Sequence, residues 1–400
     1  MKFIKIKKTI IMILGSLLYT ISYLTPKNKK LWVFGAWFGE QYADNSKYLF
    51  EYVNKNQTDI RAVWLTKNKE ALQLVRNKGY EAYYMYSIKG SVLAMQARVG
   101  IVCTSYKDIN IFFTSRMKFV QLWHGTPLKK IMCDNKISFR HIGKTKEFFK
   151  RILFPFTKEV YNIIISPSEE VSIKFESAFK AKADNIAITG YPRNDALFLE
   201  NVNVPIYAKI SDLKRKNYKT GIYMPTHRSE GKYDILNVFG ENIDYINTCL
   251  KELNTILLIK VHFYHLKELK NININFSNII FINDDDIEQD IYTILGQTDF
   301  LITDYSSILF DYLLMDKPII FAPFDKADYL KNDREFYYDY DLVTPGPKAT
   351  NWEKVIENLK NIINNQDQYR EARAAIRKKF NAYNDGNSCE RVFKVIKSII

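Results

Sequence analysis

The stretch FLITDYSSILFDYLLM, residues 300–315, decides the fold class of this chain. It begins with a short apolar run, residues 300–302, of the kind that forms a strand buried on both faces of a parallel sheet. A polar turn follows at residues 303–307, and the next apolar stretch, residues 308–315, has the length of a short helix. A strand that leads through a polar turn into a helix is half of a βαβ unit. The segment therefore predicts an α/β protein with parallel strands.

The same alternation of apolar runs and amphipathic stretches continues on both sides of this segment. It predicts further strands at residues 31–34, 62–65, 99–103, 119–122, 162–165, 186–189, 221–224, 256–261, 279–282 and 318–322. The alternation stops between residues 201 and 219, where charged residues increase. The length of 400 residues also exceeds the roughly 250 to 300 at which a single core stops growing. We therefore predict two α/β domains, residues 31–200 and 201–400.

The first 30 residues form a separate segment that is predicted to associate with a membrane. Several lysines precede residues 9–26, which contain no charged side chain, and lysines resume at Lys27. A spanning helix needs about 20 apolar residues, and small or polar residues interrupt this run, so a spanning and an interfacial helix both stay open. A cleaved signal peptide is the competing interpretation, but no small-residue cleavage site follows the run.

The formal net charge of +14 suits nucleic acid, an anionic membrane surface or a phosphate-rich substrate. The sequence contains no basic helix with interleaved aromatic residues and no nucleic-acid-binding motif, so we expect no nucleic-acid partner. The four cysteines lie far apart and form no CxxC pair, which favours a reducing compartment and argues against a cysteine zinc site. These features predict a location at the cell membrane, on its cytoplasmic side.

The first candidate site is QLWHGTPLKK, residues 121–130. His124 comes just after a predicted strand, and a Gly and a Pro turn the chain beside it. Ligands of parallel sheets bind beyond the carboxyl ends of the strands, where an imidazole can accept a proton from a hydroxyl group near neutral pH. The alternative is a histidine that is hydrogen-bonded within a turn, and the spacing leaves both interpretations open. Lys129 and Lys130 can hold phosphates of the acceptor.

The second candidate site is the polar turn that follows residues 300–302. The hydroxyl groups of Thr303, Ser306 and Ser307 and the first free N–H groups of the next helix form a potential phosphate-binding site. The alternative is a helix that is simply capped by these residues. We expect Asp311 and Asp316, further along, to be structural or solvated.

Cationic groups follow two more strands of the second half, in PTHR (residues 225–228) and KVH (residues 260–262). Fixed charges at strand ends can stabilise a departing pyrophosphate without a metal ion. The carboxylates at residues 284–286 can hold Mg²⁺, but they also stabilise the first turn of a helix, and we favour this second role. The sequence thus predicts a nucleotide-activated donor in residues 201–400, an acceptor in residues 31–200, and no metal.

At these motifs the chain resembles the CDP-glycerol glycerophosphotransferase family of teichoic acid synthesis, which includes primases and polymerases. The matching pieces are WHGTPLKK (residues 123–130), SPSE (166–169), GYPRND (190–195), PTHR (225–228), KVH (260–262) and ITDYSSILFDYLLMDKPIIF (302–321). The resemblance implies two Rossmann-like domains that face a cleft, as in glycosyltransferase-B-like folds, together with peripheral membrane association and metal-independent transfer. It also implies two essential histidines, His124 and His262.

The resemblance and the strand-end positions together define the expected site residues. Donor and phosphate binding is expected at Thr226, Arg228, Lys260, Thr303, Asp304, Ser306 and Ser307. Acceptor binding is expected at Gly125, Thr126, Lys129, Lys130, Arg193, Asn194 and Asp195. We expect the enzyme to need no cofactor beyond its donor substrate.

The resemblance implies transfer of glycerol phosphate from CDP-glycerol to a lipid-linked acceptor, such as an undecaprenyl-diphosphate-linked glycan, with release of CMP. The alternatives are ribitol phosphate transfer from CDP-ribitol and a nucleotide-sugar glycosyltransferase of the same architecture. A catalytically silent membrane scaffold is a further alternative, against which both histidines and the phosphate-binding residues argue. The chain has no long extra N-terminal domain of the kind found in some polymerases, which favours a primase or a short-chain transferase.

Overall fold

The computed structural model describes residues 2–135, 144–199, 204–226, 242–260, 276–283, 287, 290–326, 329 and 335–400. Contacts divide the chain into two compact units. Unit 1 contains Met1–His124, Met132–Asp195 and Asn387–Ile400, and unit 2 contains Gly125–Ile131 and Ala196–Gly386. The chain passes from one unit to the other between His124 and Gly125, so a candidate site residue lies at the point of crossing.

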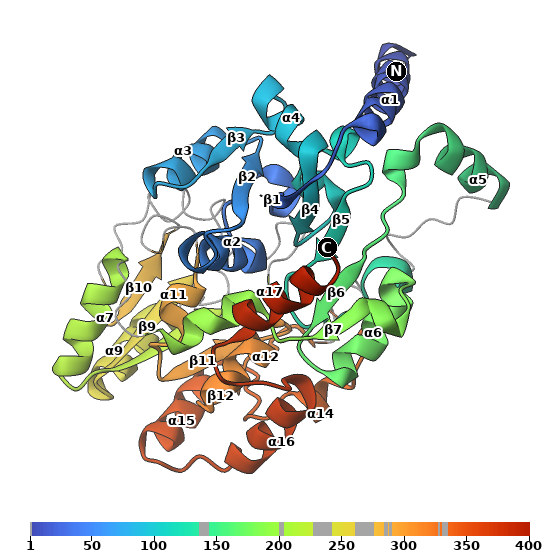
Figure 1. Ribbon diagram of the computed structural model, residues 1–400. Helices are drawn as coiled ribbons and strands as arrows, with labels where there is room; N and C mark the ends of the chain where they lie inside the picture. The colour runs from blue at the N-terminus through green and yellow to red at the C-terminus, as the bar shows by residue number, and fades with distance from the viewer. Residues whose placement is uncertain are drawn as a thin grey trace. The chain divides into compact units, whose positions relative to one another are not determined.

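Unit 1 is built on a sheet of seven strands in the order β3-β2-β1-β4-β5-β6-β7, and every pair is parallel (Figure 1). Its strands are β1 (Asn28–Phe34), β2 (Arg61–Thr66), β3 (Ala82–Tyr84), β4 (Ala97–Val102), β5 (Lys118–Gln121), β6 (Ile163–Ser166) and β7 (Ile186–Ile188). Residues 31–34 of β1 are fully buried. This burial explains why the central strands read as continuous apolar runs in the sequence.

Unit 1 contains seven α-helices in its described part, some of which cover the sheet and complete its core. They are α1 (Lys2–Leu24), α2 (Asp44–Asn56), α3 (Lys69–Asn77), α4 (Ile88–Gln96), α5 (Lys144–Leu153), α6 (Glu169–Phe179) and α17 (Ser388–Ser398). Side chains of Asn68, Ser87 and Ser168 accept hydrogen bonds from the first free N–H groups of α3, α4 and α6. The last helix, α17, packs beside α2 and adds Val392 and Phe393 to the core of unit 1 (Figure 1).

The N-terminal segment forms the single helix α1, which contacts the chain around α5. The Ser16 hydroxyl donates to the Leu153 carbonyl over 2.6 Å, and the Ser22 hydroxyl donates to the Phe113 carbonyl over 2.9 Å. Both α1 and α5 expose large apolar side chains. These are Ile10, Ile11, Ile13, Leu14, Leu17, Ile21, Tyr23 and Leu24 of α1, and Phe148, Phe149, Ile152 and Leu153 of α5. In the part of the chain that the structure describes, no helix combines the length and apolar character needed to cross a bilayer.

Unit 2 contains a second parallel sheet of five strands in the order β10-β9-β8-β11-β12. Its strands are β8 (Lys219–Met224), β9 (Thr255–Lys260), β10 (Ile279–Ile282), β11 (Phe300–Thr303) and β12 (Ile319–Phe321). The helices described in this unit are α7 (Pro205–Arg215), α9 (Ile243–Glu252), α11 (Tyr292–Leu295), α12 (Ile308–Tyr312), α14 (Tyr340–Val343), α15 (Trp352–Ile363) and α16 (Arg370–Phe380). Residues of α9 and α15 pack on the sheet around Tyr223 and Phe300.

Both sheets share one topological feature that locates their ligand-binding edges. In each sheet the strand order reverses beside the first strand of the unit, between β1 and β4 in unit 1 and between β8 and β11 in unit 2. Ligands of open parallel sheets bind beyond the carboxyl ends of the strands at this reversal. The α/β fold with two parallel sheets confirms the sequence prediction.

Three details differ from the sequence prediction. Strand β3 was not predicted, because Ala82–Tyr84 is short and contains two tyrosines instead of an apolar run. The helix after the polar turn, α12, spans only five residues and continues as the 3-10 helix η10 (Leu313–Met315). In addition, residues 387–400, assigned to the second domain in the sequence analysis, belong to unit 1 by their contacts.

Candidate active site

The chain beyond β5 makes a sharp turn that carries His124. We call residues 122–125 the His124 turn. Trp123 has a φ of 51° and Gly125 a φ of 130°, so both residues beside His124 lie in the region that side chains rarely adopt. A non-glycine residue keeps such a conformation only when its surroundings enforce it, and such residues cluster at functional sites. The geometry thus marks the His124 turn as a constrained segment of the chain.

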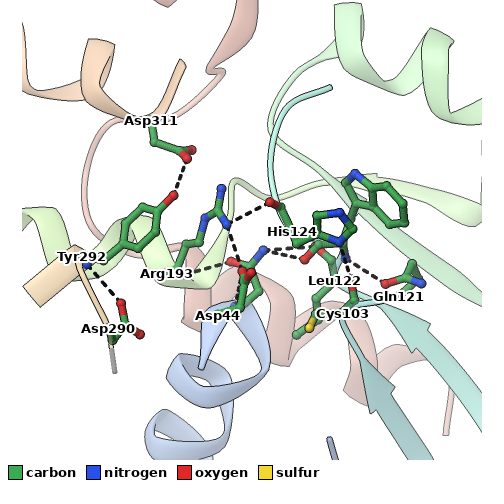
Figure 2. Close-up of polar contacts among 11 residues, drawn as sticks. Asp44, Cys103, Gln121, Leu122, His124, Arg193, Asp290, Tyr292 and Asp311 are labelled. Atoms are coloured by element: carbon green, nitrogen blue, oxygen red, sulfur yellow. Dashed lines mark hydrogen bonds and ion pairs between the residues drawn. The ribbon is translucent and has the colours of Figure 1, made fainter. Parts of the chain in front are cut away.

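The imidazole of His124 is held in one orientation by the neighbouring strand. Its Nδ1 atom lies 3.0 Å from the carbonyl oxygen of Cys103, just beyond β4 (Figure 2). A carbonyl oxygen only accepts, so Nδ1 carries the proton and Nε2 keeps its lone pair in the neutral ring. The ring of Trp37 lies 5.2 Å and that of Trp123 4.0 Å from the imidazole, between centroids. His124 is partly exposed, and in this tautomer its Nε2 atom can accept a proton.

The electrostatic surroundings favour the neutral form of His124. Loss of solvation lowers the pKa of the imidazole below its usual 6.5, and the charge of Arg193 acts in the same direction. The carboxylates of Asp44 and Asp108 and the hydrogen bond to Cys103 act against this shift. A histidine with a lowered pKa is unprotonated at neutral pH, which is the state that a general base requires.

Asp108 fixes the chain segment that carries the Cys103 carbonyl. Its Oδ2 atom accepts hydrogen bonds from the N–H groups of Cys103 and Thr104, over 2.8 and 2.7 Å. Its Oδ1 atom accepts from the Phe38 N–H over 2.7 Å and also from the Thr104 hydroxyl. Burial raises the pKa of Asp108. This one side chain therefore joins the turns beyond β1 and β4, the two strands at the topological reversal.

The GYPRND motif, which we expected to bind the acceptor, also lies beside the His124 turn. Arg193 is buried, and its Nη1 atom donates to the His124 carbonyl over 2.9 Å and to Asp44 Oδ1 over 3.0 Å (Figure 2). Asn194 is buried, and its N–H donates to the Tyr191 carbonyl. Asp195 instead accepts hydrogen bonds from the N–H groups of Ser388 and Cys389, both over 2.8 Å, at the start of α17. Burial raises the pKa of Asp195.

In unit 2, Asp304 connects the ends of the two strands beside the reversal. Its Oδ1 atom accepts from the Thr226 N–H over 2.8 Å, from the Thr226 hydroxyl over 2.5 Å and from the Tyr305 N–H over 2.6 Å. The Tyr340 hydroxyl donates to the Asp304 carbonyl over 3.0 Å. The structure thus brings together Thr226 and Asp304, two of the expected donor-binding residues. The Asp304 side chain holds the N–H groups of Thr226 and Tyr305 and thereby shapes this end of the sheet.

The hydroxyl groups of the polar turn have different surroundings. Thr303 is buried and donates to the Met224 carbonyl over 2.7 Å. Ser306 accepts from the Ile308 N–H over 3.4 Å, while Ser307, the residue before α12, makes no side-chain hydrogen bond to this helix. Ser306 and Ser307 are both partly exposed. Of the three hydroxyl-bearing residues, these two serines remain accessible to a ligand, and the expected phosphate-binding role stays a prediction.

The residues that follow the His124 turn belong to unit 2. Lys129 and Phe336 form an antiparallel bridge, the Lys130 N–H donates to the Glu335 carbonyl over 2.8 Å, and the Lys130 and Glu335 side chains form an ion pair. Lys129 Nζ lies 4.6 Å from the ring centroid of Tyr329, which stacks on Tyr305 at 4.0 Å. By sequence, both lysines fall in the predicted first domain, residues 31–200. The pairing with residues 335–337 places them in the same unit as Asp304.

Thr126 has an unusual environment within this segment. Only 1% of the residue is exposed, and its hydroxyl group finds no hydrogen-bond partner among the residues that the structure describes. Buried hydroxyl groups are nearly always paired, so an unpaired one at a candidate site indicates a missing partner.

Several predicted residues lie outside the described part of the chain. These are Arg228, His262, the neighbouring His227, and the three aspartates at 284–286. Lys260, at the end of β9, is partly exposed. Among the described residues, no group of three or more His, Cys, Asp or Glu side chains is arranged to hold a metal ion.

Sequence reasoning missed three buried residues that shape the site, Asp44, Asn45 and Asp108. The Asn45 amide donates to the carbonyls of Leu122 and Trp123, 77 and 78 residues further along the chain. No spacing rule connects positions so far apart. One signal could have located Asp44 and Asn45. The doubly wound topology places the turn after residues 31–34 at the strand reversal, where ligands bind.

Comparisons with known proteins identify relatives of this chain. Residues 17–398 match the model of a family described as CDP-Glycerol:Poly(glycerophosphate) glycerophosphotransferase. The chain is 28% identical to a teichoic acid glycerol-phosphate transferase of Staphylococcus aureus, over 98% of this chain and 99% of that protein. It is 32% identical to a teichoic acid poly(glycerol phosphate) polymerase of Bacillus spizizenii, over 86% of both. A solved structure of the wall teichoic acid polymerase TagF superimposes with a TM-score of 0.75 at 25% identity, covering 99% of this chain and 96% of that one.

Proposed function

The chain belongs to the CDP-glycerol:poly(glycerophosphate) glycerophosphotransferase family, and from this premise we propose how its residues transfer glycerol phosphate from CDP-glycerol in teichoic acid synthesis. The enzyme is a phosphotransferase of the CDP-polyol type. We also propose that the enzyme consists of two Rossmann-like domains that face a shared cleft, as in glycosyltransferase-B-like enzymes.

His124 is the proposed general base. Nε2 takes the proton from an acceptor hydroxyl group, and the oxygen then attacks the β-phosphorus of CDP-glycerol. A new phosphodiester bond forms, the bond between the β-phosphorus and the bridging oxygen breaks, and CMP leaves with the electron pair. The single observation that carries this role is the hydrogen bond from Nδ1 to the Cys103 carbonyl, because it leaves the lone pair on Nε2.

The donor phosphates are proposed to bind at the carboxyl ends of β8 and β11. Ser306 and Ser307 supply accessible hydroxyl groups, and Asp304 holds the Thr226 and Tyr305 N–H groups that shape this edge. Lys260, Arg228 and His262 complete the proposed site with positive charge that stabilises the leaving CMP. These fixed charges make a metal ion and any further cofactor unnecessary in the proposal.

The acceptor is proposed to bind along residues 125–131. The Thr126 hydroxyl, buried and without a partner among the described residues, is suited to a hydroxyl or phosphate oxygen of the substrate. Lys129 and Lys130 add positive charge beside it, which suits a diphosphate-linked glycan on an undecaprenyl or other lipid carrier. A lipid-linked acceptor requires the enzyme to work at a membrane.

Membrane association is proposed to involve α1 and α5, on the cytoplasmic side of the cell membrane. In α5, Phe148, Phe149, Ile152 and Leu153 are about 60% exposed, and Lys150 and Arg151 lie in the last turn of the helix. Apolar side chains beside basic ones are typical of segments that lie in the interface of an anionic bilayer. The exposed apolar residues of α1, which contacts α5 through Ser16, extend this surface.

The proposal is tested by measuring CMP release from CDP-glycerol in the presence of a synthetic lipid-linked disaccharide, with mass spectrometry of the product. We expect CMP release and addition of glycerol phosphate to the acceptor. Turnover of CDP-ribitol in place of CDP-glycerol would move the assignment to ribitol phosphate transfer. Transfer of a sugar from a labelled nucleotide sugar would favour a glycosyltransferase, and the absence of any turnover would favour a scaffold.

A further inference from the structure

We propose that Asp44, Asn45 and Arg193 are positioning residues of the transfer reaction, which hold the His124 turn so that Nε2 meets the acceptor hydroxyl group. This inference rests on the proposed role of His124 as the base. None of the three side chains is proposed to touch the substrate. Their role is to fix the backbone that carries the imidazole.

Each backbone carbonyl of residues 122–124 accepts a hydrogen bond from a side chain. The Asn45 amide Nδ2 atom donates to the Leu122 carbonyl over 3.2 Å and to the Trp123 carbonyl over 2.8 Å. Arg193 Nη1 donates to the His124 carbonyl over 2.9 Å (Figure 2). Three consecutive peptide carbonyls are therefore held by two side chains from elements distant in the sequence.

Asn45 and Arg193 are also tied to each other through the Arg193 backbone. Asn45 Oδ1 accepts the backbone N–H of Arg193 over 3.0 Å, and Arg193 Nη1 lies 3.0 Å from Asp44 Oδ1. Both side chains of the Asp44–Arg193 ion pair are 6% exposed, and Asn45 is fully buried. A buried guanidinium with two acceptors in fixed directions has little freedom to move. The carbonyls of the turn are thus fixed to a rigid, water-excluded group of side chains.

The shape of the His124 turn explains why such support is needed. Trp123 has a φ of 51°, and a non-glycine residue leaves this conformation when nothing holds it. The Trp123 N–H is also fixed, since it donates to Gln121 Oε1 over 2.9 Å. A backbone rotation at Trp123 would turn the imidazole away from the Cys103 carbonyl. The lone pair of Nε2 would then point in a different direction.

A purely structural role would leave the chemistry unchanged, so the test needs a readout specific to the base. Among the described residues, the charged groups that act on His124 are Asp44 at the start of α2, Asp108 between β4 and β5, and Arg193 in the GYPRND motif. The substitution Asp44→Asn removes a negative charge, whereas Asn45→Asp adds one beside the same turn. The two substitutions should therefore move the pKa of His124 in opposite directions.

The experiment measures CMP release with CDP-glycerol across pH for the full-length wild type, Asp44→Asn, Asn45→Asp and Arg193→Lys. We expect kcat to fall at least tenfold in each variant, because a misplacement of about 1 Å can cost about 100-fold. The KM for CDP-glycerol should change by less than about twofold, since the proposed donor site lies in unit 2. The acid limb of the profile should move to lower pH in Asp44→Asn and to higher pH in Asn45→Asp.

Asn185→Asp is the matched control in the same unit. The Asn185 amide also donates to a backbone carbonyl, that of Tyr161 over 3.2 Å. Asn185 lies just before β7, at the amino-terminal ends of the parallel strands, whereas the His124 turn follows the carboxyl-terminal end of β5. We expect this variant to keep the kcat and pH profile of the wild type. Thermal unfolding of every variant separates loss of folding from loss of positioning.

Each outcome has a defined meaning. Wild-type kcat and an unshifted acid limb in folded Asp44→Asn and Asn45→Asp would overturn the positioning role. If Asn45→Asp does not fold, Asp44→Asn decides, because asparagine is nearly isosteric and tolerates the φ of 63° at position 44. Full activity in His124→Ala, or no CMP release by the wild type, would instead overturn the proposed function.

Discussion

The Nδ1 atom of His124 lies 3.0 Å from the backbone carbonyl oxygen of Cys103. Because the carbonyl can only accept, this contact selects the tautomer in which Nε2 is the basic nitrogen. Asp108 holds the N–H groups of Cys103 and Thr104, so the acceptor of this hydrogen bond is itself immobile. The end of one strand therefore sets the chemical state of a residue at the end of the next.

His124→Asn should lower CMP release by about 100-fold to 10,000-fold, the range typical of a general base. The asparagine amide can still donate to the Cys103 carbonyl, so we expect the thermal unfolding midpoint to stay within a few degrees of the wild type. Steady-state kinetics and a thermal melt of the same preparation check both expectations. Wild-type turnover in this variant would rule out His124 as the base.

The acid limb of the kcat/KM profile should have its midpoint below pH 6.5. His124 acts as a base only when neutral, which is the state above its pKa, and loss of solvation lowers this pKa from 6.5. The neutral form therefore persists to lower pH than in an unperturbed histidine. CMP release measured between pH 5 and pH 8 at low CDP-glycerol concentration checks this, because kcat/KM reports groups of the free enzyme. A midpoint above 6.5 would contradict it.

The sequence indicates the fold of this chain well because the central strands are buried on both faces. Residues 31–34 and residues 300–303 are all buried, and such strands read as uninterrupted apolar runs. The last helix, α17, lies in the predicted second domain by sequence but belongs to unit 1 by its contacts. Its apolar face fits any core equally well, and only contacts with α2 reveal that it completes unit 1.

Only part of the candidate site was predictable from the sequence, because some of its residues act through backbone groups. His124 and the polar turn at residues 303–307 stand directly after strands, so the rule that ligands bind at strand ends finds them. Asn45 and Arg193 act through backbone carbonyls instead. A carbonyl exists at every position of the sequence, so nothing in the residue types reveals which ones need support.

Asp304→Ala should lower the free energy of unfolding by about 2 to 4 kcal/mol, because it removes the carboxylate that accepts from the half-buried N–H and hydroxyl of Thr226 and from the buried N–H of Tyr305. Asp304→Asn keeps one acceptor oxygen at the same place and should cost less. Urea denaturation of both variants measures the difference. Equal losses would show that these hydrogen bonds contribute little. The KM for CDP-glycerol should rise in both, because Asp304 shapes the proposed phosphate-binding edge.

Replacing Phe148 and Phe149 with serine should weaken binding to anionic lipid vesicles by about tenfold or more, since each buried aromatic side chain contributes about 1.5 to 3 kcal/mol. Both are exposed on α5. The matched control replaces Leu342 and Tyr369, exposed apolar residues of unit 2, and should bind as the wild type does. Co-sedimentation with vesicles of phosphatidylglycerol measures binding. Equal losses in both double variants would contradict a membrane role for α5.

Thr126→Val separates a substrate contact from a structural one. The Thr126 hydroxyl is buried without a partner among the described residues, so a methyl group in its place should leave the free energy of unfolding unchanged or slightly raise it. Thr220→Val is the contrasting variant, because the Thr220 hydroxyl donates to Asp299 over 3.2 Å and its loss should cost about 1 kcal/mol. If the substrate supplies the missing partner, the KM for the lipid-linked acceptor should rise about fivefold to tenfold in Thr126→Val alone. An unchanged acceptor KM in this stable variant would remove Thr126 from the acceptor site.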